Sequence, residues 1–277
     1  MDRLTQWRSG ELLLDVRDDG PASGTPALLL HGFPQDGTSW DRVVPALHDA
    51  GLRTLVPDQR GYAPGARPRG RRAYRIELLV EDVVALLDAA GLERAHVVGH
   101  DWGGIVAWAL AAQHPERVAS LTVASVPHPR ALSRSLLSSP QALRSAYVGL
   151  FQLPRLPEAL LGPRLEDLLR RSGLPAAEAA RYAARMREPG ALTAALDWYR
   201  ALPLSRLRTG PVDVPTTYAW GDRDGALGRR AAELTIEHVR GPYRFAELDA
   251  GHWLPETRAE ELARLVLERV RGATGPA

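Results

Sequence analysis

The chain has 277 residues, 45% of them hydrophobic, and its formal net charge at pH 7 is only +2. This length suits one large α/β domain, or a core domain with an insertion. The chain has no Cys, which excludes a disulfide framework and a thiolate metal site. All of its Lys and Arg positions are Arg, and the densest cluster, 67–72, lies beside Gly and Pro. Such a cluster is typical of a solvated loop and not of a nucleic-acid-reading helix.

Targeting signals are not evident. Residues 1–10 contain no apolar core of the kind that a secretory signal needs. No uninterrupted apolar stretch is long enough to span a bilayer. We therefore expect a cytoplasmic protein without a nucleic-acid or membrane partner, either a monomer or a homodimer.

The first half of the chain alternates predicted strands with predicted helices. Residues 26–30 form a continuous apolar run, as buried parallel strands do. Further strands are expected at 11–16, 53–58, 95–98 and 118–124, and helices at 39–47, 75–90 and 105–112. This alternation favours an α/β fold with a mostly parallel central sheet and right-handed crossovers.

The alternation stops after Pro127 and resumes near residue 210. Between these points no strand is evident, and helices are expected at 141–150, 164–171, 176–186 and 191–202. Two strands, 214–220 and 243–248, and a closing helix, 260–270, then complete the sheet region. We expect a core domain of residues 1–128 and 210–277, an all-helical cap domain of residues 129–209, and a loose tail after Gly272.

The stretch Gly99-His100-Asp101-Trp102-Gly103-Gly104 lies between a predicted strand and a predicted helix. A strand, a sharp glycine-flanked turn and a helix are the context of a nucleophile elbow. The residue at its tip is Asp101, whose carboxylate is ionised at neutral pH and attacks carbon without activation by a base. A helix-capping Asp in a Gly-rich turn is the alternative interpretation.

Possible partners of this carboxylate follow later in the chain, at the ends of predicted strands. Asp224 follows strand 214–220, and His252 follows strand 243–248. The order nucleophile, acid, base is that of α/β hydrolases, and ligands of such sheets bind at the carboxyl ends of the strands. Asp222 competes with Asp224 for the role of the acid, but we expect it to cap the following turn.

Nearly the whole chain resembles the epoxide hydrolase branch of the α/β-hydrolase superfamily, in the motifs G-H-D-W-G-G, H-G-F-P, D-Q-R-G-Y, W-G-D-R-D and G-H-W. The resemblance implies that Asp101 is the nucleophile, that His252 is the base and that Asp224 orients it. It also implies two cap tyrosines that hold the epoxide oxygen, which Tyr147 in Y-V-G-L-F-Q and Tyr199 in D-W-Y-R match. These two tyrosines could instead be packing residues, the role that we expect for Tyr182.

The chemistry expected from these residues is hydrolysis of an epoxide to a vicinal diol through an ester on Asp101. His252 activates the water that cleaves the ester, and the backbone N–H groups of Phe33 and Trp102 form the oxyanion hole. No metal and no organic cofactor is expected. Two further histidines are expected to be structural: His31, as a brace of the oxyanion loop, and His100.

The substrate is expected to be a small apolar epoxide. The aromatic residues Phe33, Trp102, Phe151, Trp198 and Trp253 suggest an apolar pocket. Terpenoid, styrene-like, fatty and polyketide epoxides all remain open.

Two other functions remain open beside this one. A haloalkane or haloacid dehalogenase uses the same ester chemistry, but it needs a second halide donor, such as Asn after His-Gly. Here that position is Phe33, and the chain has no Asn. A catalytically weak ligand-binding homologue would not need the complete set of Asp101, Asp224 and His252.

Overall fold

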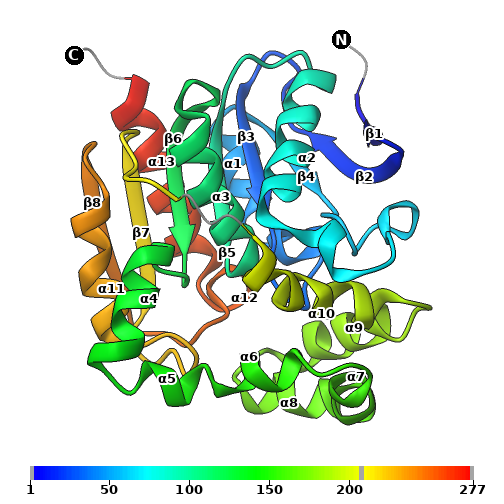
Figure 1. Cartoon of the computed structure of the whole chain (residues 1–277). Coiled ribbons are helices and arrows are strands. Elements are labelled where there is room, and N and C mark those ends of the chain that lie inside the picture. Colours follow the sequence, from blue (N-terminus) through cyan, green and yellow to red (C-terminus); the bar gives the residue numbers. More distant parts are fainter. Residues whose placement is uncertain (1–2, 206–208, 275–277) are drawn as a thin grey trace.

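A sheet of eight strands runs through the part of the chain that the computed structural model describes, residues 3–205 and 209–274. The strand order is β1-β2-β4-β3-β5-β6-β7-β8 (Figure 1). The strands are β1 (Gln6–Ser9), β2 (Leu12–Asp19), β3 (Thr25–Leu30), β4 (Leu52–Pro57), β5 (Ala95–His100), β6 (Val118–Ala124), β7 (Thr216–Gly221) and β8 (Tyr243–Leu248).

The sheet is mostly parallel, which confirms the expected fold class. β4, β3, β5, β6, β7 and β8 pair in parallel, whereas β1 pairs with β2 and β2 with β4 in the antiparallel sense. Every residue of β4, β5 and β7 is buried. These strands are covered on both faces, so even their polar residues, such as Arg53, His96 and Thr216, are buried.

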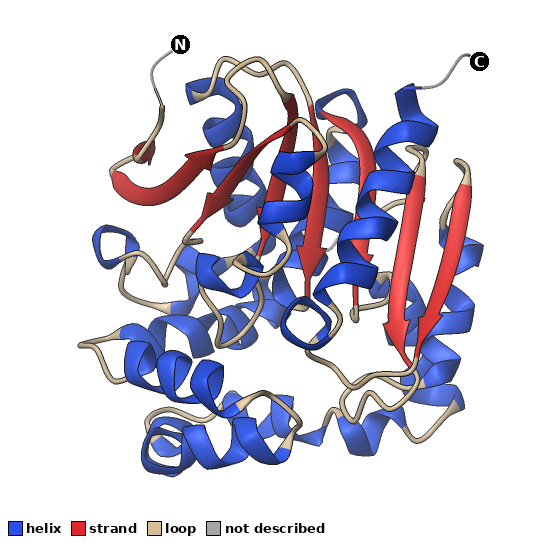
Figure 2. Cartoon of the chain, turned by 180° about the vertical axis from the view of Figure 1, so that it is seen from behind, coloured by secondary structure: helices blue, strands red, loops and turns tan. Residues whose placement is uncertain are grey.

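Helices cover both faces of the sheet, as the two opposite views show (Figures 1 and 2). The side chains of α2 (Ile76–Ala89) and α3 (Trp102–Gln113) belong to one apolar cluster, and those of α1 (Val44–Asp49) and α13 (Ala259–Thr274) to another. The sheet therefore separates two cores, one on each face. No helix of the described residues is both long and apolar enough to cross a membrane.

The segment after β6 consists of helices that lie beyond the carboxyl ends of the strands (Figure 1). These cap helices are α4 (Pro129–Ser138), α5 (Gln141–Arg144), α6 (Ala146–Phe151), α7 (Leu156–Leu161), α8 (Leu165–Arg171), α9 (Ala176–Met186) and α10 (Ala191–Ala201). Two 3₁₀ turns, Gly162–Arg164 and Leu202–Leu204, accompany them. The division into core and cap domains stays a prediction, and residues 206–208 of the expected cap and 275–277 of the expected tail lie outside the described residues.

Two expected helices are each broken in the structure. The predicted helix 39–47 is a 3₁₀ turn, Gly37–Trp40, followed by α1, because the Asp36 side chain accepts a hydrogen bond from the Thr38 N–H and Pro45 starts a new helix. The predicted helix 141–150 is divided at Ser145 into α5 and α6.

Several short elements were not predicted from the sequence. They are β1, α4, α7, α11 (Arg229–Leu234), α12 (Leu254–Thr257) and the 3₁₀ turns Pro64–Ala66, Arg71–Tyr74, Pro115–Arg117 and Thr235–His238. Most of them have fewer than seven residues, so they carry too few positions for a periodic apolar pattern.

Candidate active site

Asp101 occupies the sharp turn between β5 and α3. Its backbone has φ 49° and ψ −120°, a conformation that L-residues rarely adopt and that holds the side chain at the end of the sheet. The turn needs glycines around it. A Cβ on Gly103 would lie 2.2 Å from the backbone oxygen of Leu30, and a Cβ on Gly32 would lie 2.4 Å from the Cβ of Asp101. The local sequence thus fits a nucleophile elbow and not a simple capping turn.

The two carboxylate oxygens of Asp101 have different surroundings. Oδ1 accepts a hydrogen bond from the backbone N–H of Phe33 at 2.8 Å, and Oδ2 lies 3.6 Å from Nε2 of His252. Burial alone would raise the pKa of Asp101, but the bond and charge of His252 and the Phe33 N–H outweigh it and lower this pKa. The carboxylate is therefore ionised at neutral pH.

Asp224, and not Asp222, contacts the imidazole of His252. Its Oδ2 accepts from Nδ1 of His252 at 2.8 Å, and its Oδ1 accepts from the N–H groups of Ala226 and Leu227 at 2.8 and 3.0 Å. The expectation that Asp222 caps the following turn is wrong, because Asp224 accepts from the N–H groups of that turn. Asp222 is exposed, and its Oδ1 accepts from the N–H of Ala250 in the loop after β8.

The pKa of His252 responds to both neighbouring carboxylates. Burial alone would lower it, but the charges of Asp224 and Asp101 raise the pKa of His252 well above its usual value. The imidazole is thus protonated as long as both carboxylates carry their charge. Loss of the charge on Asp101 would lower this pKa and leave a neutral base.

The two predicted tyrosines of the cap lie together near Asp101. Tyr147 on α6 and Tyr199 on α10 have ring centroids 6.1 Å apart. Burial, with the charge of Asp101 as a further cause, raises the pKa of both phenols above its usual value. Both hydroxyls therefore stay protonated and able to donate.

Aromatic side chains from core and cap surround these phenols. The ring of Tyr199 lies 4.8 Å from that of Trp102, 5.4 Å from that of Phe33 and 4.9 Å from that of Phe151. Phe33 carries the N–H that binds Asp101, and Trp102 is the first residue of α3, so its own N–H has no acceptor within the helix. The structure brings these predicted site residues together.

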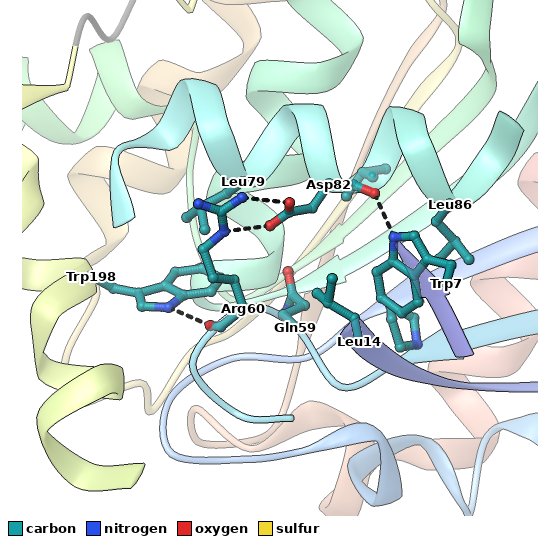
Figure 3. A pocket seen from close by; sticks show the side chains of 10 residues that line it. Trp7, Leu14, Gln59, Arg60, Leu79, Asp82, Leu86 and Trp198 are labelled. Atoms are coloured by element: carbon teal, nitrogen blue, oxygen red, sulfur yellow. Dashed lines mark hydrogen bonds and ion pairs between the residues drawn. The ribbon is translucent and has the colours of Figure 1, made fainter. Parts of the chain in front are cut away.

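The two other predicted pocket residues lie at the edges of this group. Trp253 packs its ring 5.1 Å from that of His252 and donates its indole N–H to Oγ of Ser172. Trp198 contacts the ring of Trp102 at 5.5 Å, but its indole N–H donates to the backbone oxygen of Arg60. Figure 3 shows Trp198 at the wall of a small cavity, and Asp101 is not among the residues that line this cavity. A substrate-binding role of either residue stays a prediction.

Figure 3 also shows how Arg60, whose backbone oxygen accepts from the indole N–H of Trp198, is itself fixed. Arg60 forms a two-bond ion pair with Asp82 on α2, at 2.6 and 2.7 Å, and both side chains are buried. Trp7 closes the other side of the cavity and donates its indole N–H to the backbone oxygen of Asp82. This arrangement supports the wall behind Trp102.

The backbone around the site is held by two buried histidines. His31 accepts from the N–H of Gln59 through Nε2, so its Nδ1 carries the proton and donates to the Gly32 oxygen at 3.0 Å. The ring of His100 lies 2.8 Å from Oε1 of Gln35 and 2.9 Å from the backbone oxygen of His252. Both have the structural surroundings that we expect for them.

Two buried residues beside the site were missed by the sequence analysis. Gln35 donates to Oε1 of Glu256 at 2.7 Å, although 221 positions separate them. The only signals in the sequence are that Gln35 follows the H-G-F-P stretch and that Glu256 lies four residues after His252. Among the described residues, no group of three or more His, Asp or Glu side chains could hold a metal ion.

Comparison with known proteins gives a consistent result. Residues 25–259 match the family model described as the alpha/beta hydrolase fold. The chain is 38% identical over 266 residues to the AB hydrolase superfamily protein YfhM of Bacillus subtilis, with 92% of each protein covered. It is 33% identical to Epoxide hydrolase A of Mycobacterium tuberculosis, with 94% of each covered. The crystal structure of Epoxide Hydrolase A from Mycobacterium thermoresistibile superposes with a TM-score of 0.84 at 30% identity, covering 96% of this chain and 97% of that one.

Proposed function

Because this chain belongs to the epoxide hydrolase family of the α/β-hydrolase superfamily, we propose that it hydrolyses an apolar epoxide to a vicinal diol through an ester on Asp101. The observation that carries this proposal is the chain of contacts from Asp101 through His252 to Asp224, with two phenols close by. The residues supply a nucleophile, a base, an acid that orients the base and two donors for the epoxide oxygen.

In the first step, Oδ2 of Asp101 attacks an epoxide carbon from the side opposite the ring oxygen. Oδ1 is held by the Phe33 N–H, whereas Oδ2 has only the longer contact of 3.6 Å with Nε2 of His252. The carbon–oxygen bond of the ring breaks, and its electron pair stays on the ring oxygen, which takes a proton from Tyr147 or Tyr199. A donor aimed at such developing charge contributes about 3 kcal/mol to the lowering of the barrier.

In the second step, water cleaves the ester. Esterification removes the charge of Asp101, and this loss lowers the pKa of His252. The protonated imidazole of His252 then gives its proton, through solvent, to the tyrosine that protonated the epoxide oxygen. Neutral His252 then takes a proton from water, and the hydroxide attacks the carbonyl carbon of Asp101. Oδ1 becomes the oxyanion and is held by the N–H groups of Phe33 and Trp102. The bond to Oδ2 breaks, and the diol oxygen receives the proton from His252. The new carboxyl group of Asp101 then gives its proton to His252, which restores the ionised carboxylate and the protonated imidazole.

A single turnover in heavy-oxygen water tests this order of events. We expect the label in the Asp101 carboxylate and an unlabelled diol, because water attacks the ester carbonyl and not the substrate carbon. His252→Gln should accumulate an adduct on the peptide that contains Asp101, visible by intact-protein mass, whereas Asp101→Ala should form none. A labelled diol from an unlabelled enzyme would mean that water opens the epoxide directly.

A further inference from the structure

A buried carboxyl group lies behind the catalytic residues without a part in the proposed reaction. Glu256 is on α12, four residues after His252, and is only 4% exposed. Its Oε1 accepts two hydrogen bonds, from Nε2 of Gln35 at 2.7 Å and from the hydroxyl of Tyr182 on α9 at 2.9 Å. Burying a carboxyl group is unfavourable unless hydrogen bonds or a paired charge offset the cost, so these two bonds matter for the stability of the site.

The partner of this carboxyl group, Gln35, connects three segments of the active site. Its Oε1 accepts from the Gly32 N–H at 2.8 Å, which fixes the amide oxygen on that side, and it lies 2.8 Å from Nδ1 of His100. Gly32 precedes the oxyanion residue Phe33. His100 precedes the nucleophile, and its Nε2 lies 2.9 Å from the backbone oxygen of His252.

We propose that Glu256 is a positioning residue that acts through the amide of Gln35. It keeps two loops in the correct position relative to Asp101: the loop after β3, which contains Phe33, and the loop after β8, which contains His252. The proposal rests on the reaction proposed above. Oε1 of Glu256 provides the acceptor that keeps the nitrogen of Gln35 on one side and its oxygen on the other. Without that acceptor the amide is free to rotate, and the Gly32 N–H loses its partner.

Hydrolysis of the ester depends more strongly on the position of these two loops than formation of the ester does. Hydrolysis of the ester needs the Phe33 N–H at the oxyanion and the imidazole of His252 at the water, so both loops must be in place. Attack by Oδ2 on the epoxide needs only the ionised carboxylate and the cap phenols. Loss of the acceptor should therefore cause the ester to accumulate.

The proposed role of Glu256 requires Oε1 as a hydrogen-bond acceptor and does not require a negative charge on the carboxyl group. Burial raises the pKa of Glu256 to about 7. Apart from Gln35, the groups that face it are Tyr182, His252, and Arg42, which donates to its backbone oxygen and pairs with Glu178. Oε2 has no hydrogen-bond partner among the described residues, so a proton there leaves Oε1 free to accept both bonds. Glu256→Gln keeps an oxygen at Oε1, because two donors point at that position.

The experiment compares five variants with the wild-type enzyme in rapid-mixing mass measurements of both steps. Three of them change the proposed chain of contacts: Glu256→Met, Gln35→Met and the variant with both changes. Two are controls: Glu256→Gln keeps the acceptor oxygen, and Glu178→Met removes a neighbouring buried carboxyl group that does not contact Gln35. We expect Glu256→Met to slow ester hydrolysis about tenfold or more, and ester formation about threefold or less. The double variant should be no slower than Gln35→Met alone, because both changes break one chain of contacts. Glu178→Met and Glu256→Gln should keep both steps within about threefold of wild type.

The outcomes separate this proposal from the proposed function. Additive losses in the double variant, wild-type hydrolysis in Gln35→Met, or a Glu256→Gln variant as slow as Glu256→Met would each overturn the positioning role. If Glu256→Met does not fold, hydrolysis at the wild-type rate in Gln35→Met would still overturn the proposal, because Glu256 is proposed to act through the Gln35 amide. Amide exchange at Gly32, followed by NMR without substrate, should be faster in Glu256→Met than in Glu178→Met. If the wild-type enzyme forms no ester, the proposed reaction fails, while the exchange result still tests the contacts.

Discussion

At the scale of single residues, the cap phenols bear most directly on the choice of reaction. Tyr147 and Tyr199 lie side by side near Asp101, and both stay protonated. We expect Tyr147→Phe or Tyr199→Phe to slow ester formation about a hundredfold, and the double change to nearly abolish it. Stopped-flow rates of ester formation measure the effect, and Tyr182→Phe, in the cap but bonded to Glu256, is the control. Wild-type rates in the double variant would contradict the role of the phenols.

The residue after His31-Gly32, Phe33, bears on the choice between epoxide hydrolysis and dehalogenation, the two reactions that proceed through an ester on Asp101. Phe33 offers only its backbone N–H, and Oδ1 of Asp101 already uses it. The rings of Trp102 and Tyr199 lie 4.8 Å apart, so the ring of Tyr199 packs against the indole and leaves less room for a halide ion there. Short chloroalkanes and bromoalkanes should therefore release no halide above the level of an Asp101→Ala control, measured by ion chromatography. Halide release as fast as diol formation would favour the dehalogenase alternative.

At the scale of elements, the elbow depends on glycines that leave room for neighbouring backbone. A Cβ on Gly103 would lie 2.2 Å from the oxygen of Leu30 and 2.5 Å from that of His31, and neither backbone can easily move. Gly103→Ala should lower the free energy of unfolding by about 1–3 kcal/mol or more and distort the position of Asp101. Gly149 on α6 has no atom within 4 Å of such a Cβ, so Gly149→Ala should stabilise by about 0.5–1 kcal/mol. Urea denaturation measures both, and equal effects would contradict this account.

The elements that could be predicted from the sequence are those with a strong local pattern. Strand β8 and helix α9 have the predicted bounds. Aromatic and apolar residues, two of them at alternate positions (Tyr243 and Phe245), mark the strand, and Ala residues at helical spacing mark the helix. The proximity of Asp101, Asp224 and His252 was predictable because each follows a predicted strand and the fold gathers strand ends at one edge. The contact between Gln35 and Glu256 was not predictable, because it joins residues 221 positions apart in the sequence. Local patterns contain no information about such contacts.

At the scale of the whole molecule, the cap helices are tied to the sheet region by ion pairs that cross between them. Arg185 on α9 donates to Oδ2 of Asp58, the residue after β4, at 3.1 Å and to Oε1 of Glu188 at 2.9 Å. Arg67 donates to the other oxygen of Glu188 at 2.7 Å. The side chain of Arg185 is 23% exposed, so solvent screens these interactions only in part.

Arg185→Met should therefore loosen the cap more than it destabilises the sheet. We expect the free energy of unfolding to fall by about 1 kcal/mol and limited proteolysis to cut within α5 to α8 faster than in the wild-type protein. Arg230→Met is the matched control, since its ion pair with Glu233 spans 4.0 Å on the surface of α11 and should matter by less than about 0.5 kcal/mol. Because the Arg185 contacts are partly screened, added salt should reduce the difference between the two variants. Identical cleavage patterns in both variants would show that the cap is held by its apolar contacts and not by this cluster of charges.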